Sequence, residues 1–388
     1  MARPIWLGCL DGPPDPLWTG CEVSTLPSAP KLDAQDSTVS PGDTDISPTV
    51  ADDTDTDTDT AGAEPEETMA PLVGPIEACS GRDDDGDNAV DEDCVAIGRG
   101  ARNVILMVGD GMGFEQLQAA RVFLGRPLAF DVLAIQGRVR TARYDGGLTD
   151  SASAATAMAT GHRVAKGVIS RAIPGDGGAI ETVTELYRRM GRRTGLVTTH
   201  TGITDSTPAA FGADADHRND QDALAEAYLT KSRPNVLMDR PGALHPFLAA
   251  QADYDVVQTE ASLETVDLMG TSHLAGLFVD DSTPSLSTRA AAAFQLLDAD
   301  IDGFFLLIET EQTGSAGHSN DLAGVLAGIV ELEATYEVVR ALVANRDDTL
   351  VVITADHETG GLELFWSQGG PDASRRGVAV FSTDVQTV

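Results

Sequence analysis

A serine that follows an aspartate opens the stretch with the clearest chemical potential in this sequence. Ser151 comes after Asp150 and begins a run of alanine, methionine and threonine that favours a helix, closed by Gly161. Unpaired backbone N–H groups at a helix N-terminus attract anions such as phosphate. A hydroxyl nucleophile beside an anion site suits phosphoryl transfer through a covalent intermediate. Taken alone, this pattern is more often an N-cap serine on a small-residue packing helix.

Four continuous apolar runs predict the strands that would position partners for this serine. They span residues 103–108, 195–199, 304–308 and 350–354. Helical stretches lie between them, among them residues 181–190 and 321–344. This order, with strands apolar at every position, indicates an α/β layered domain with a parallel sheet from about residue 101 onward. Each run is followed by a polar residue at the sheet edge where α/β proteins place their sites: Asp110, His200, Glu309 and Asp356.

Together these motifs resemble those of the alkaline phosphatase family over roughly residues 101–381. The matching motifs are Gly109–Gly113, Asp150-Ser151, Asp205–Ala210, Glu309 and Thr354–His357. The resemblance implies an α/β fold, a three-layer α/β/α sandwich with a mostly parallel central sheet. It also implies hydrolysis of small-molecule phosphate monoesters through a phosphoserine, with Zn²⁺ and Mg²⁺ as cofactors. Sulfate ester or phosphodiester hydrolysis is the sister activity, but the Asp-Ser motif favours phosphate monoesters.

The resemblance assigns a role to each matching residue. It makes Ser151 the nucleophile and Arg218, eleven residues after Thr207, the guanidinium whose fork clamps the phosphate, with Asp150 beside them. The second zinc site would take Asp110, Asp356, His357 and the oxygen of Ser151. The magnesium site would take oxygen ligands from Asp110, Thr207 and Glu309. Taken singly, Arg218 is more often a surface arginine. Adjacent Asp356 and His357 are commonly a capping turn, and Thr207 is typical of a residue before a proline turn.

The first zinc site departs from the family pattern. His318 lies nine residues after Glu309, as the resemblance implies, but Gly314 stands where the family has an aspartate. No histidine follows His357 in the sequence, and the missing one would fall near Ala373, ahead of a late strand at residues 378–381. One of three protein ligands remains, whereas zinc takes about three or four.

Several interpretations of this departure stay open. Glu311 is a candidate substitute ligand, and Asp205 is a further, weaker candidate. Alternatively, the protein works with fewer metals or is a degraded paralogue. A third alternative is that the boundaries of its gene are assigned wrongly at both ends. Asp214 stands where some relatives have another residue type, which could alter metal preference. On the sequence alone, Gly314→Asp is expected to raise zinc content or hydrolysis rate.

Three classes of function therefore compete. The first is a metal-dependent phosphate monoester hydrolase, and the second is a catalytically impaired phosphate-binding paralogue on the same scaffold. Turnover, rather than binding, separates these two. The third is a surface-anchored calcium-binding module with the Asp-rich loop as the working part. Deletion of residues 1–97 discriminates it, because the other two functions survive that deletion.

The overall charge narrows the partners. The 388 residues carry a formal net charge of −35, which argues against nucleic acid because phosphate backbones require Lys and Arg. No apolar stretch reaches the roughly 18–20 residues of a transmembrane span. The carboxylate excess suits divalent cations and an extracytoplasmic protein, whether periplasmic, cell-surface or secreted. Family members are often dimers, so the resemblance also implies a homodimer.

The first 97 residues differ in amino-acid composition from the rest of the sequence. Residues 1–78 are expected to be a leader and an acidic disordered linker, and Leu17–Cys21 loosely resembles a lipoprotein box, which implies a lipid anchor. Residues 79–97 hold Cys79 and Cys94, expected as a disulfide rather than free thiols. Between them, Asp83–Asp93 matches a Ca²⁺ loop about as well as a solvated acidic turn. Residues 98–388 form the expected catalytic domain.

Overall fold

The computed structural model describes residues 8–9, 101–199, 202–240, 242–279, 282–366 and 377–381. The expectations on the lipoprotein box, the acidic linker, the cysteine pair and the calcium loop lie outside the described residues. The same holds for His200, for Ala373 and for the last residues of the chain.

Seven parallel strands form the central sheet, in the order β5-β6-β4-β3-β7-β2-β8. Their bounds are β2 Asn103–Gly109, β3 Arg193–Thr198, β4 Val236–Asp239, β5 Asp255–Val257, β6 Leu274–Leu277, β7 Phe304–Thr310 and β8 Thr349–Ala355. The four apolar runs of the sequence correspond to β2, β3, β7 and β8. The parallel sheet expected from those runs is therefore confirmed.

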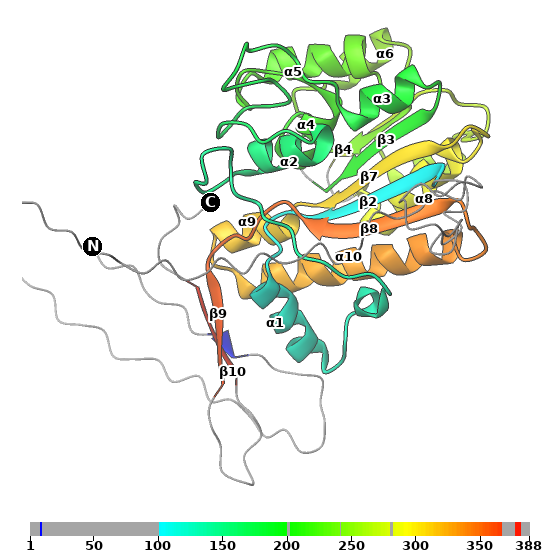
Figure 1. Cartoon of the computed structure of the whole chain (residues 1–388). Coiled ribbons are helices and arrows are strands. Elements are labelled where there is room, and N and C mark those ends of the chain that lie inside the picture. Colours follow the sequence, from blue (N-terminus) through cyan, green and yellow to red (C-terminus); the bar gives the residue numbers. More distant parts are fainter. Residues whose placement is uncertain are drawn as a thin grey trace, which may run out of the picture. The chain divides into compact units, whose positions relative to one another are not determined.

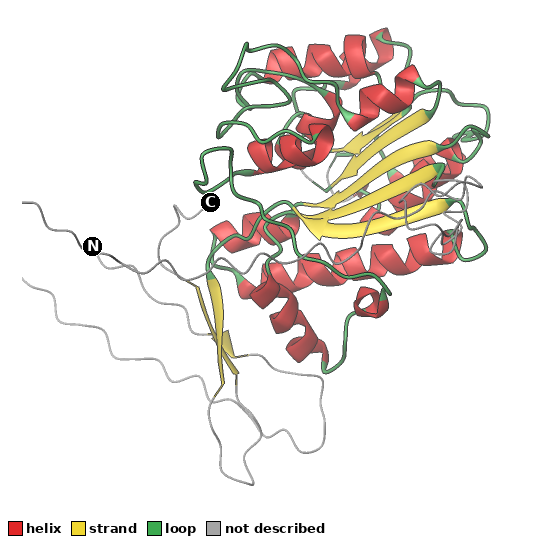
Figure 2. Ribbon diagram, in the orientation of Figure 1, coloured by secondary structure: helices red, strands yellow, loops and turns green. Residues whose placement is uncertain are grey.

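Helices cover both faces of this sheet and complete three layers (Figures 1 and 2). One face carries α2 Ser151–Thr160, α3 Val183–Arg189, α4 Ser206–Gly212, α5 Gln221–Ala227 with the π-helical turn η2 Tyr228–Ser232, and α6 Pro246–Gln251. The other carries α1 Phe114–Leu124, η1 Ala129–Val132, α7 Glu260–Thr265, α8 Leu286–Leu297, α9 Gln312–His318 and α10 Leu322–Leu342. The expected α/β/α sandwich is confirmed.

Each face of the sheet has its own hydrophobic core, and β7 contributes to both. Phe304 packs edge-on against Phe294 of α8 on one face. Phe305 stacks on Phe211 of α4 and contacts Tyr187 of α3 on the other. Successive side chains of a strand point to opposite faces, so a strand covered on both sides needs apolar residues throughout. This explains why the run is continuous rather than alternating.

The ends of α3 follow its capping residues rather than the apolar pattern. The helix begins at Val183, not at the expected residue 181, because the Thr182 side chain accepts a hydrogen bond from the N–H of Glu185. The Glu185 carboxylate in turn accepts one from the N–H of Thr182, which completes a capping box.

Among the described helices, none combines the length and apolar character that crossing a membrane requires.

A second, smaller antiparallel sheet comes later in the chain. In it β9, Leu362–Trp366, pairs with β10, Gly377–Phe381, and β10 also pairs with the short β1, Gly8–Cys9. The late strand expected at residues 378–381 is therefore present as β10.

Candidate active site

Two aspartates and a histidine meet at the carboxyl ends of the neighbouring strands β2 and β8. Gly109 pairs with Ala355 across these strands, so the residues that follow, Asp110 and Asp356, leave the sheet at the same level. One ligand atom from each of Asp110, Asp356 and His357 lies within 4.8 Å of the others, and all three residues are buried. The structure thus brings together the three residues that the sequence assigned to one zinc site.

The two carboxylate oxygens of Asp356 differ in their hydrogen bonding. Its Oδ1 accepts hydrogen bonds from the backbone N–H of Gly111 at 3.0 Å and of His357 at 2.8 Å. Its Oδ2 lies 3.2 Å from Nε2 of His357 but makes no hydrogen bond of normal geometry within the described chain. Burial and then the charge of Asp110 raise the pKa of Asp356 to about 6. A bound cation would satisfy this buried oxygen.

The ring of His357 links this cluster to the serine. Its Nδ1 lies 3.1 Å from the backbone oxygen of Glu358, and a carbonyl oxygen can only accept, so the neutral ring carries its proton on Nδ1. Nε2 then presents its lone pair 3.1 Å from Oγ of Ser151. Burial lowers the pKa of His357, but the charges of Asp356 and Asp110 outweigh burial and raise it overall.

Ser151 is the first residue of α2, and Asp150 is the N-cap. Oδ1 of Asp150 accepts hydrogen bonds from the N–H of Ser153 and of Gly167, each at 3.1 Å. Burial raises the pKa of Asp150, but these bonds and the Ser153 hydroxyl outweigh it and lower the pKa overall. The helix starts at Ser151 and ends at Thr160, with Gly161 as its C-cap, as predicted. Because Asp150 provides the cap, the interpretation of Ser151 as a capping residue is wrong.

Glu309 lies near the carboxyl end of β7, an interior strand of the sheet that pairs with β2. Its side chain is fully buried. Its Oε1 accepts from the N–H of Thr207 at 3.3 Å, and its Oε2 accepts from the hydroxyl of Thr198. Burial, and then the charges of Asp110 and Asp356, raise the pKa of Glu309 well above its usual range. The buried Oγ1 of Thr207 has no hydrogen-bond partner of normal geometry in the described part of the chain. Thr207 and Glu309, two of the three expected magnesium ligands, are therefore in contact.

Arg218 is held at the site by two carboxylates. Its Nη2 lies 2.8 Å from Oδ1 of Asp205, and its Nη1 lies 3.5 Å from Oδ2 of Asp150. Together with Ser151 and Asp110, Arg218 lines a cavity of about 600 Å³. Asp205, a weaker candidate metal ligand in the sequence, is thus a tether for the arginine fork.

Two further residues of this cavity with titratable side chains were missed by sequence reasoning. Lys166 and His217 both line it. Nδ1 of His217 accepts a hydrogen bond from the N–H of Asn219 at 3.2 Å, so the neutral ring carries its proton on Nε2. No motif spacing marks either residue, although His217 directly precedes Arg218 in the sequence.

The residues expected around the first zinc site fall into two groups. His318, at the end of α9, and Glu311, just before its start, line the cavity as the sequence implied. Burial chiefly lowers the pKa of His318. Gly314 lies between them and also lines the cavity. Asp214, expected to tune the metal preference, instead pairs with Lys231 at 2.6 Å and is not among the cavity-lining residues.

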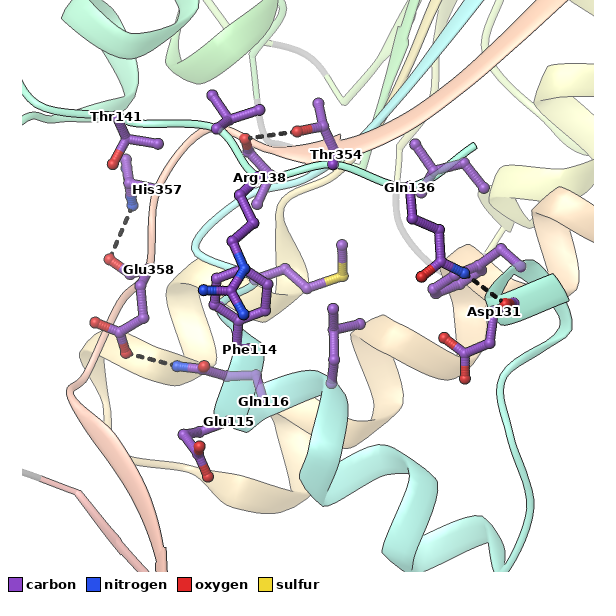
Figure 3. A pocket seen from close by; sticks show the side chains of 18 of the residues that line it. Phe114, Glu115, Gln116, Asp131, Gln136, Arg138, Thr141, Thr354, His357 and Glu358 are labelled. Atoms are coloured by element: carbon purple, nitrogen blue, oxygen red, sulfur yellow. Dashed lines mark hydrogen bonds between the residues drawn. The ribbon is translucent and has the colours of Figure 1, made fainter. Parts of the chain in front are cut away.

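A second pocket, of about 580 Å³, is lined in part by His357 and Glu358 (Figure 3). The guanidinium of Arg138 stacks over the ring of Phe114 there, 5.5 Å from its centroid. Nε2 of Gln116 donates to the carboxylate of Glu358 at 2.6 Å. Helix α1 is thereby tied to the turn after β8 that carries the catalytic candidates.

The glycines of the Gly109–Gly113 motif let two loops touch. Gly111 has a φ of 65°, and a β-carbon there would lie 2.6 Å from Oγ1 of Thr359. A β-carbon at Gly113 would lie 2.4 Å from Cγ of Glu358. The motif therefore keeps the loop after β2 close enough to the loop after β8 for Asp110 to reach Asp356.

The fold and site together define a class of protein: a parallel α/β sandwich whose sheet edge holds a serine at a helix start, an arginine fork and a cluster of buried carboxylates. The alkaline phosphatase family model matches residues 101–240 and 248–381. The chain belongs to the alkaline phosphatase family, and the resemblance seen in its motifs is confirmed.

Individual relatives agree with this assignment. Alkaline phosphatase 3 of Bacillus subtilis is 34% identical over 296 residues, which cover 68% of this chain and 62% of that protein. The crystal structure of a cold-active alkaline phosphatase from Shewanella sp. is 29% identical, covers 69% of this chain and 70% of that one, and has a TM-score of 0.60. A mutant TAB5 alkaline phosphatase with Mg bound in its M3 site shares the fold, with 24% identity, 73% and 87% coverage, and a TM-score of 0.62. The chain spans about 62% of the length of the first two curated relatives.

Proposed function

We propose that this protein is a metal-dependent phosphate monoester hydrolase that works through a phosphoserine at Ser151. One observation carries the proposal: Oγ of Ser151 lies 3.1 Å from Nε2 of His357, in a cavity that Asp110 and Arg218 also line. The proposed nucleophile, phosphate clamp and cation-binding cluster would therefore share one site.

The donor atoms fit the two cations that the family implies. Asp110, Asp356 and His357 would hold Zn²⁺, because they offer one imidazole nitrogen and carboxylates, one of whose oxygens is unsatisfied. Asp110, Glu309 and Thr207 would hold Mg²⁺, a hard cation that prefers oxygen ligands, and the Thr207 hydroxyl is likewise unsatisfied. When bound, such cations stabilise the negative charge on a serine oxygen and on phosphate.

Different residues of the chain would bind the phosphate and attack its phosphorus atom. The guanidinium of Arg218 and the N–H groups at the start of α2 bind two or more phosphate oxygens. Oγ of Ser151 attacks phosphorus while the bond to the alcohol oxygen breaks, and the alcohol leaves with a proton. Water then attacks the phosphoserine, the bond between phosphorus and Oγ breaks, and phosphate and the Ser151 hydroxyl are restored.

A catalytically impaired phosphate-binding paralogue is the second candidate. The observation that favours it is Gly314, which supplies no ligand where the family has an aspartate. In that case Ser151, Arg218 and the second metal site would still take up phosphate, but the phosphoserine would not turn over.

Trapping of phosphoserine on the purified full chain distinguishes these candidates. The protein is supplied with Zn²⁺, Mg²⁺ and an aryl phosphate, and the phenol and free phosphate are followed separately. Continuous release of both supports the hydrolase. A single burst of phenol with stable phosphate on Ser151 supports the impaired paralogue, whose phosphoserine is not hydrolysed. No burst would mean that the protein binds phosphate without forming a phosphoserine.

The remaining expectations stay predictions. We propose that residues 98–388 form the catalytic domain, preceded by the linker and the Asp-rich loop, and that the protein is extracytoplasmic. Lipid anchoring, calcium at Asp83–Asp93 and homodimer formation are further predictions that rest on the sequence.

A further inference from the structure

The segment that follows β3 and includes the first turn of α4 sets the position of Thr207. It runs from Ile203 to Pro208, and Asp205, the tether of Arg218, lies in its middle. Two residues of the proposed site therefore depend on how this one short segment is held.

Tyr228 bonds to both ends of that segment. Its hydroxyl lies 2.7 Å from the carbonyl oxygen of Ile203 and 2.6 Å from that of Pro208. The side chain is fully buried, so water cannot replace either bond. A phenol has a single proton to donate, so the two carbonyls share it. One buried hydroxyl thus fixes the span that contains Asp205 and Thr207.

The surroundings of Tyr228 are shaped around its ring. A β-carbon at Gly212, the last residue of α4, would lie 1.9 Å from Cε1 of Tyr228, so glycine is required for the ring to fit. Tyr228 begins the π-helical turn η2, and such turns occur frequently at functional sites. The ring thereby reaches from the end of α5 to the start of α4, where its hydroxyl donates to the carbonyl oxygen of Pro208.

A second buried group holds the same segment from the sheet. The N–H of Ile203 donates to Oδ2 of Asp239, at the end of β4. At the other end of the segment, the N–H of Thr207 donates to Oε1 of Glu309. The segment is thereby fixed relative to Glu309 as well as to Tyr228.

We propose that Tyr228 is a positioning residue for the cation site of Thr207 and Glu309. It touches neither substrate nor cation, and acts by fixing the backbone on both sides of Thr207. The proposal rests on the proposed function, since it takes that pair as Mg²⁺ ligands.

The test is Mg²⁺ binding to the full chain by isothermal titration calorimetry, with thermal unfolding in parallel. Tyr228→Phe keeps the ring and removes the hydroxyl. The matched control is Tyr254→Phe, because Tyr254 is also buried and its hydroxyl donates to one backbone carbonyl, that of Pro234, at 2.7 Å. We expect Tyr228→Phe to weaken Mg²⁺ binding about 10-fold or more, the scale for residues that orient ligands. Tyr254→Phe should bind Mg²⁺ as the wild type does, although it also loses stability.

Equal Mg²⁺ affinity in the wild type and Tyr228→Phe would overturn the proposal, as would equal losses in the two tyrosine variants. Absence of Mg²⁺ binding in the wild type would overturn both this proposal and the magnesium part of the proposed function. If Tyr228→Phe does not fold, Asp239→Leu serves instead, because it releases the N–H of Ile203 from its bond. Unchanged Mg²⁺ affinity in that variant would also contradict a positioning role for the segment.

Discussion

Gly314 lies directly against the carboxylate of Asp110: a β-carbon built at Gly314 would come 2.2 Å from Oδ1 and 2.9 Å from Cγ of that aspartate. The glycine is therefore more than a missing ligand. It leaves the space in which the Asp110 side chain lies, so position 314 cannot gain a side chain unless α9 or Asp110 moves.

This contact reverses the expectation for Gly314→Asp. The variant should lower zinc content and turnover, because the new side chain displaces Asp110. Gly314→Ala is the control, since it adds the β-carbon without a carboxylate and should lower stability by about 1–3 kcal/mol. Zinc content by mass spectrometry and turnover of an aryl phosphate are measured on both variants. A rise in either quantity for Gly314→Asp alone would restore the interpretation drawn from the sequence.

Ser151→Ala should abolish turnover and keep phosphate binding. The variant loses the nucleophile, whereas Arg218 and the start of α2 remain. We expect turnover to fall at least about 1000-fold, the scale for loss of a nucleophile, with phosphate affinity within a few-fold of wild type. Ser285→Ala is the control: it removes the N-cap of α8, which costs about 1 kcal/mol, and should leave turnover unchanged. Unchanged turnover in Ser151→Ala would rule out the proposed nucleophile.

Glu309→Gln should separate cation binding from folding. The substitution replaces a buried carboxyl group whose ionisation is disfavoured by burial and by the charges of Asp110 and Asp356, so the chain without divalent cations should be as stable as the wild type or more stable. The gain in melting temperature on adding Mg²⁺ should disappear. The control is Glu333→Gln, because Glu333 is buried too but pairs with Arg126 at 2.6 Å. That variant should lose stability yet keep its response to Mg²⁺, and a retained response in Glu309→Gln would contradict the assignment.

Tyr228 should make the stability of the protein sensitive to alkaline pH. Burial, and then the charges of Asp239 and Glu309, raise the pKa of Tyr228 well above its usual value. The unfolded chain ionises this group above about pH 10 while the folded chain keeps the proton, so its contribution to stability is lost as the pH rises further.

The advantage of the wild type over Tyr228→Phe should therefore shrink above that pH, by up to about 1.4 kcal/mol per pH unit. Urea unfolding at pH 8, 10 and 11 measures it. Tyr144→Phe is the control because Tyr144 is exposed, and its difference from the wild type should not change with pH. A constant difference for Tyr228→Phe would mean that the buried phenol ionises in the folded protein as well.

The sequence was sufficient to predict those parts of the site that follow directly from strands. Asp110, Glu309 and Asp356 each come at the end of an apolar run, and parallel strands bring such ends to one edge. The start of α2 was predictable because a run of helix-forming residues follows Asp150 and ends at a glycine.

Other parts could not be predicted because they depend on contacts between distant segments. Lys166 and His217 belong to no periodic pattern or spaced motif in the sequence. Only the tertiary structure shows that they line the cavity. Tyr228 looks like an ordinary core residue, and its two carbonyl partners lie 20 and 25 residues earlier. The contact of Gly314 with Asp110 could not be predicted for the same reason: it joins α9 to the end of β2.

The order of strands also has a consequence for how the protein matures. β2 lies between β7 and β8, and the hydrogen bond from Gly111 to Asp356 joins residues 245 positions apart. A ribosome adds about 5–20 residues per second. The residues after β8 are therefore synthesised roughly 12–50 seconds later than those after β2, with which they form the site. The nascent chain is therefore expected to stay inactive until synthesis has passed β8. On the proposed function, the unfinished protein would not hydrolyse phosphate esters in the cell during that interval.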